Sequence, residues 1–111
     1  MTSTSAPVPE HIAEALNRLW TRFLPEIEHR LALVESASGA ASAGALDSAT
    51  RQAAHEAAHK LAGSLGTFGL QRGTELARQI EHILDEEVPS SAANDLKLWT
   101  AELRSLIQSR T

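Results

Sequence analysis

The sequence contains no cysteine, and this absence excludes disulfides, thiolate metal sites and cysteine nucleophiles. Aromatic residues are scarce, with two tryptophans, two phenylalanines and no tyrosine. Positive charge is not in excess either, because 10 Lys and Arg residues stand against 14 Asp and Glu residues, giving a net charge of −4. Nucleic acid is therefore not expected as a partner, since binding to phosphate backbones requires a concentrated basic face.

Long hydrophobic runs are also missing, and no run approaches the roughly 20 apolar residues that a membrane span needs. Residues 1–9 lack the basic and apolar parts of a signal peptide. We therefore expect a cytoplasmic protein with no membrane partner. The 111 residues, of which 42% are hydrophobic and 22% are charged, are typical of one small globular domain, most simply a monomer.

Four segments have hydrophobic residues at the three- and four-residue steps of helices, and no segment favours a strand. They cover residues 9–35, 46–68, 70–87 and 90–109. The stretch from Ser36 to Gly44, rich in Ala, Ser and Gly, is predicted to be a loop, and Pro25 predicts a kink or a division in the first helix. The sequence thus predicts an all-α, antiparallel four-helix bundle over residues 9–111, after a flexible tail at residues 1–8.

The second segment carries the most informative pattern. Its apolar stripe consists of Ala54, Ala58, Leu61 and Leu65. On a helical wheel His59 lies roughly 130° from this stripe, on the solvent side, and Gly63 and Gly66 lie close to it. A glycine inside a helix costs about 1 kcal/mol relative to alanine, so two such positions need a reason. A bare backbone would let the surface of a partner approach the imidazole. For Gly69, a role in ending the helix is the better explanation.

The run His59-Lys60-Leu61-Ala62-Gly63-Ser64, followed by Gly66, Gly69-Leu70, Leu76, Ile80 and Glu81, resembles the histidine phosphotransfer (HPt) domain of bacterial two-component phosphorelays. The resemblance implies that His59 is the phosphoacceptor, which takes a phosphoryl group from a receiver-domain aspartate and passes it to another. It implies that Gly63 lets the receiver dock over the imidazole and that Glu81 accepts a hydrogen bond from the ring.

The partners that the resemblance implies are response-regulator receiver domains and a hybrid histidine kinase. Because no glycine-rich nucleotide loop follows a strand, the chain is expected to be a phosphocarrier rather than an ATP-dependent kinase, with no cofactor. Supporting roles fall to Lys60, Ser64, Gly66 and His55. Ala62 departs from the family pattern, because many members carry lysine there, three residues after the histidine, where it helps to hold the phosphoryl group. On the wheel, Ser64 points away from His59.

Two alternatives remain open. The string His55-Glu56-x-x-His59 matches that of zinc peptidases, in which the histidines bind zinc and the glutamate acts as general base. The extended peptidase pattern has glycine and histidine where this chain has Ala62 and Leu65, which leaves Glu81 as the best third ligand, so no metal site is expected. A helical adaptor that binds a partner without covalent chemistry is the other alternative. It explains the helices but not a glycine at position 63 beside an exposed histidine.

Overall fold

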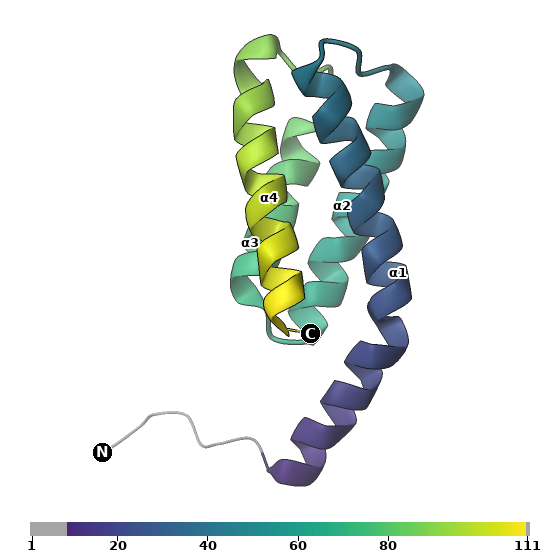
Figure 1. Ribbon diagram of the computed structural model, residues 1–111, viewed down its shortest axis with the longest axis vertical. Coiled ribbons are helices and arrows are strands. Elements are labelled where there is room, and N and C mark those ends of the chain that lie inside the picture. The colour runs from purple at the N-terminus through teal and green to yellow at the C-terminus, as the bar shows by residue number, and fades with distance from the viewer. Residues whose placement is uncertain (1–8, 111) are drawn as a thin grey trace, which may run out of the picture.

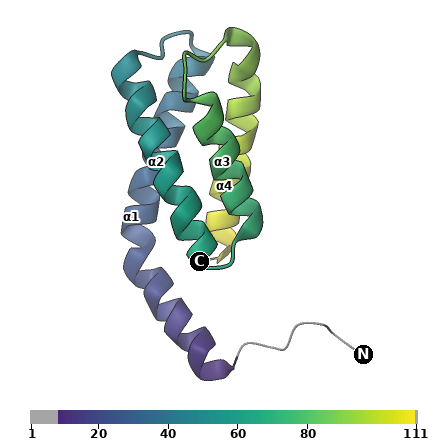
Figure 2. The same cartoon turned by 180° about the vertical axis from the view of Figure 1, so that it is seen from behind.

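The computed structural model describes residues 9–110, which form four α-helices and one short 3₁₀ helix. The elements are α1 (Glu10–Ser42), α2 (Ser48–Thr67), α3 (Gln71–Ile83), η1 (Ser90–Ala92) and α4 (Ala93–Arg110). Helices α1 and α3 each pack beside α2 and α4, and successive helices run antiparallel (Figures 1 and 2). The predicted all-α, four-helix bundle is confirmed. The predicted tail at residues 1–8 lies outside the described residues.

The interior of the bundle is built from aliphatic side chains that all four α-helices contribute. The largest fully buried ones are Ile27, Leu31, Val34, Leu61, Leu65, Leu76, Ile80, Leu84, Leu96, Leu103 and Ile107. Burial of each such side chain contributes about 1.5–3 kcal/mol, so this core is the main source of stability. At one end of the bundle Trp20 packs edge-to-face on Phe68, with ring centroids 5.2 Å apart. Within residues 9–110, no helix is long and apolar enough to cross a membrane.

Helix α1 is continuous over 33 residues with Pro25 inside it, so the first helix is not divided at this proline. Figure 1 shows its N-terminal part leaning away from the line of the rest and extending beyond the end of the bundle. A proline inside a helix removes one backbone hydrogen bond and commonly bends it. Before Pro25 in α1, Ile12, Leu19 and Phe23 remain 40–49% exposed.

The predicted loop from Ser36 to Gly44 is wrong for most of its length, because α1 continues to Ser42. Ala37 and Ser38 are buried in the bundle, and this packing keeps a small-residue segment helical. After Ser42 and the C-cap residue Ala43, the chain leaves the helix at Gly44, whose φ of 68° lies in the region that favours glycine. The amide of Ala45 then donates to the carbonyl of Ala40, which completes a Schellman cap.

Helix α3 ends at Ile83, four residues earlier than predicted. The guanidinium of Arg51 on α2 donates to the carbonyl oxygens of Leu84, at 2.7 Å, and Asp85, at 3.0 Å. These carbonyls therefore have partners without a further helical turn. Three consecutive acidic residues, at positions 85–87, also disfavour continuation, because the C-terminal end of a helix is already negative.

Candidate functional site

The candidate site lies where α2 and α3 pack against each other. Nδ1 of His59, from α2, lies 2.8 Å from Oε2 of Glu81, from α3. The His59 side chain is 67% exposed, whereas that of Glu81 is 23% exposed. The two residues that the sequence suggested as a pair, 22 positions apart, are therefore in direct contact, with the imidazole outermost.

The chain holds this pair in place through the ends of α2 and the short turn into α3. At its N-terminus, the side chain of Asp47 accepts a hydrogen bond from the Thr50 amide at 2.7 Å and caps the helix. At its C-terminus, Gly69 has a φ of 72°, and the amide of Leu70 donates to the carbonyl of Leu65. This Schellman cap is the helix-ending role expected for Gly69. It reverses the chain, so that α3 runs back alongside α2 and brings Glu81 to His59.

The contact with Glu81 determines the chemistry of the imidazole. A carboxylate only accepts hydrogen bonds, so the proton of the neutral ring resides on Nδ1 of His59. Nε2 then carries the lone pair, on a side chain that is two-thirds exposed. The arrangement presents a nucleophilic nitrogen to solvent, with a carboxylate behind it to offset any positive charge that develops on the ring.

The glycines near His59 leave its surroundings open. A Cβ built at Gly63 would meet nothing within 4 Å, so packing inside this protein does not require a glycine there. A Cβ at Gly66 would meet only Oγ1 of Thr74, at 3.5 Å, which is an ordinary contact. Both positions are exposed on α2. The bare backbone beside His59 therefore has no internal structural cause among the described residues.

Two of the proposed supporting residues face away from His59, toward α1. Lys60 lies 3.9 Å from Glu56 and borders a depression between α1 and α2. Ser64 accepts a hydrogen bond from Arg30 of α1 at 3.1 Å, on the side of α2 expected from the helical wheel. The contacts of both side chains are thus with Glu56 and Arg30 rather than with His59. Ala62 is buried at the interface with α3, where its carbonyl oxygen accepts a hydrogen bond from Thr74.

His55 lies one turn before His59 and belongs to a second imidazole–carboxylate pair. Its Nε2 atom is 3.4 Å from Oδ1 of Asp85. In the part of the chain that the structure describes, no three His, Asp or Glu side chains gather closely enough to hold a metal ion. The two histidines of the zinc-peptidase string thus contact separate carboxylates, Glu81 and Asp85, and Glu56 is directed toward Lys60.

Sequence reasoning missed two residues at this site. Asp85 and Arg78 line an open depression of about 270 Å³ together with His55, Glu81 and His82. The available signal was spacing, because Arg78 lies three residues before Glu81 and Asp85 lies four residues after it. Within α3, the first spacing places Arg78 on the same face as Glu81, whereas Asp85 follows the end of the helix.

Comparison with protein families agrees with this geometry. The family model described as the Hpt domain matches residues 18–109, which include all of α2 and α3 and both residues of the pair. The chain belongs to the Hpt family. Hpt domains take part in histidine phosphotransfer within phosphorelays, as phosphocarriers that interact with receiver domains and histidine kinases rather than as kinases themselves. The match begins at residue 18, within α1. No curated protein and no solved structure matches this chain.

Proposed function

We propose that this Hpt domain accepts a phosphoryl group on His59 from the phospho-aspartate of one receiver domain and passes it to the aspartate of another. The observation that carries the proposal is the pairing of Nδ1 with Glu81, which leaves Nε2 exposed as the nucleophile. The proteins that donate the phosphoryl group to His59 and accept it from His59 are response-regulator receivers, including the receiver of a hybrid histidine kinase. In this role the chain is a phosphocarrier without a cofactor.

The transfer conserves charge and protons at the site. The lone pair of Nε2 attacks phosphorus, a P–N bond forms, and the P–O bond to the receiver aspartate breaks. The aspartate leaves as a carboxylate with the bonding electron pair, and the proton on Nδ1 stays with the ring. The imidazolium that results is stabilised by the Glu81 carboxylate. In the onward step an aspartate of the second receiver attacks phosphorus and the P–N electrons return to Nε2.

A receiver must approach the imidazole closely for this reaction, because phosphoryl transfer depends chiefly on position and charge neutralisation. The exposed backbone at Gly63 and Gly66, one and two turns beyond His59, supports such an approach. The competing adaptor function also predicts an exposed face, but it gives no role to the His59–Glu81 pair. No contact of the described residues favours the peptidase.

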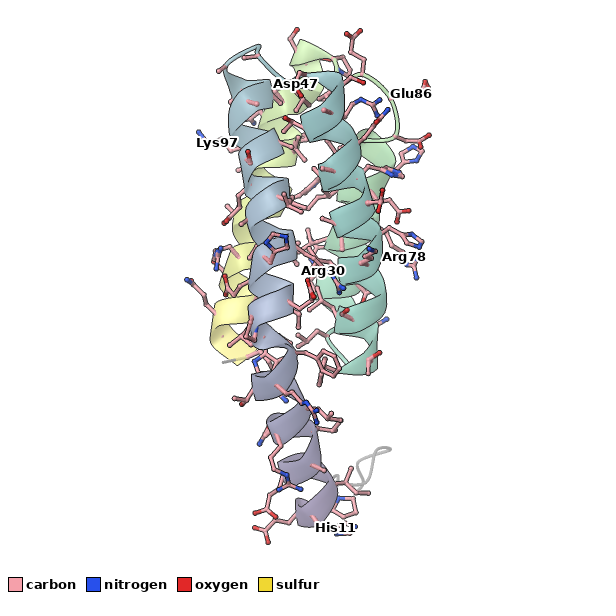
Figure 3. The ribbon with its side chains drawn as sticks, turned by 90° about the vertical axis from the view of Figure 1, so that its right-hand side faces the viewer. His11, Arg30, Asp47, Arg78, Glu86 and Lys97 are labelled. Atoms are coloured by element: carbon pink, nitrogen blue, oxygen red, sulfur yellow. The ribbon has the colours of Figure 1, made fainter. Side chains whose placement is uncertain are left out.

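The test is phosphorylation by receivers. The chain is incubated with a panel of phosphorylated receiver domains, and its intact mass and the modified residue are measured. We expect the gain of one acid-labile phosphoryl group on His59, absent in His59→Ala and retained in His11→Ala. His11 is another exposed histidine, at the far end of α1 (Figure 3). Phosphate on another residue, or none with any receiver, would contradict the proposal.

A further inference from the structure

The charge that a phosphoryl group brings to His59 has no matching cation on the same helix. Such a group carries about −1.5 to −2 charge near neutral pH. On α2, which the structure describes in full, Ala62 stands where the family resemblance implies lysine. Lys60 is directed toward Glu56 and α1. The nearest charged neighbour of the imidazole is Glu81, which is itself an acceptor.

The register between α2 and α3 shows which side chain of α3 faces this position. Contacts across the interface pair His55 with Asp85 at 3.4 Å and His59 with Glu81 at 2.8 Å. The next contact pairs the Ala62 carbonyl with the Thr74 hydroxyl at 3.3 Å. As the numbers on α2 rise, those on α3 fall, so the segment of α3 between Thr74 and Glu81 lies opposite the stretch from His59 to Ala62.

Arg78 occupies the middle of that segment and the same face. It lies four residues after Thr74 and three before Glu81, the two spacings that bring side chains together on a helix. It is exposed and borders the same depression as Glu81. Figure 3 shows it at the outer edge of the bundle. Within residues 9–110, Arg78 has no ion-pair partner, whereas Arg30, Arg72 and Arg104 each have at least one.

We propose that Arg78 binds the phosphoryl oxygens of phospho-His59 and supplies, from α3, the positive charge that Ala62 does not supply from α2. This inference rests on the proposed function of His59. A guanidinium suits the role, because its planar fork donates two parallel hydrogen bonds to phosphate oxygens and it stays charged at all physiological pH values. The length of the arginine side chain lets it reach along the surface from the adjacent turn.

A test without a receiver separates this proposal from the function of the domain. Phosphoramidate, a small phosphoryl donor, is used to modify the exposed imidazole of His59, and mass spectrometry locates the group. The titration of the phosphoryl group is then followed by phosphorus NMR. The variants are Arg78→Ala, Arg78→Lys and the matched control Lys97→Ala. Lys97→Ala removes the same charge from the opposite edge of the bundle (Figure 3).

We expect the phosphoryl pKa to be higher in Arg78→Ala than in the wild type and Lys97→Ala, because a nearby cation favours the doubly charged form. Arg78→Lys should lie between them, since lysine keeps the charge without the fork. In equilibrium with a phosphorylated receiver, the fraction of phospho-His59 should fall about three- to tenfold in Arg78→Ala.

An unchanged phosphoryl pKa in Arg78→Ala would overturn the proposal. If only the transfer from a receiver fell, Arg78 would be a docking residue for the receiver and not a phosphoryl ligand, which also overturns it. Failure of every receiver to phosphorylate His59 would instead contradict the proposed function. The phosphoramidate measurement would still show whether Arg78 binds the group.

Discussion

The carboxylate of Glu81 lies 2.8 Å from Nδ1 of His59 and is about a third as exposed as the imidazole it contacts. The carboxylate is therefore on the inner side of the ring, and the reactive nitrogen is on the outer side. This one contact fixes both the tautomer and the orientation of the ring. Its part in transfer can therefore be tested by substituting Glu81 while His59 is kept.

Substitution of Glu81 should lower the rate of phosphorylation, and the decrease should be larger when no hydrogen-bond acceptor remains. Glu81→Gln keeps an acceptor oxygen but loses the charge, so we expect a modest decrease in the rate of phosphorylation. Glu81→Ala loses both, and the loss of a hydrogen bond to a charged group at this partly buried position predicts a decrease of up to about tenfold. Rapid-quench measurement of phospho-His59 formation checks the order. Equal rates in the wild type and Glu81→Ala would show that the contact has no part in transfer.

Substitution of Gly63 should separate folding from docking. A Cβ at Gly63 meets nothing within 4 Å, and the same is true of Gly39, a second helical glycine, located on α1. Both Gly63→Leu and Gly39→Leu should raise the melting temperature, because leucine is the better helix former by about 0.8 kcal/mol. Only Gly63→Leu should block phosphorylation by a receiver, since its side chain stands beside His59.

Thermal unfolding and receiver-dependent phosphorylation, measured on both glycine variants, give the comparison. Phosphoramidate labelling of Gly63→Leu adds a control, because so small a donor should still reach His59. Undiminished transfer from receivers to Gly63→Leu would refute the steric explanation for this glycine.

The cap of α2 predicts a dependence of stability on acid pH. The backbone amide of Thr50 donates to Asp47 and holds the pKa of this carboxyl below its ordinary value. A carboxyl whose folded-state pKa is lowered adds stability above its unfolded pKa of about 4 and loses it as pH falls through the folded pKa. Asp47→Asn keeps an acceptor for the cap but does not titrate. Between about pH 5 and pH 3 the melting temperature of the wild type should therefore fall more than that of Asp47→Asn. Parallel curves would show that the cap is not ionised or not formed.

The sequence predicted those parts of the fold that depend on hydrophobic periodicity. The stripe of Ala54, Ala58, Leu61 and Leu65 placed His59 on the outer face of its helix, where the structure has it. The position of Ala62, three residues after His59, could not show that this residue is buried at the interface with α3. Whether a position between core and surface is covered depends on the neighbouring helix, and the spacing within one helix does not contain this information.

Helix ends were less predictable, because contacts distant in sequence decide them. The continuation of α1 to Ser42 depends on the burial of Ala37 and Ser38 against other helices. The early end of α3 depends on Arg51, 33 residues before the carbonyl of Leu84 that it contacts. Arg78 was missed for the same reason, since its significance follows from the register between α2 and α3. The local propensity of the residues does not indicate where these helices end or which side chain faces the neighbouring helix.

Arg104 joins the first and last helices, and its loss should destabilise the bundle. Its guanidinium donates two hydrogen bonds to Glu35, at 2.8 and 2.9 Å, and a third to Glu28, at 2.6 Å. These bonds raise the pKa of Arg104 above its ordinary value, with those to Glu35 the larger cause. In Arg104→Ala two half-buried carboxylates on α1 lose their shared partner.

We expect Arg104→Ala to lower the free energy of unfolding by about 1–2 kcal/mol, because a bidentate, partly buried network exceeds the value of an exposed pair. Arg72→Ala is the matched control, since Arg72 also forms a two-bond pair with Glu102 but both side chains are more exposed. Urea denaturation should show a larger loss in the free energy of unfolding for Arg104→Ala than for Arg72→Ala. Added salt should reduce the difference between the two variants only in part. Equal losses in the two variants would show that Arg104 contributes no more than an ordinary surface pair.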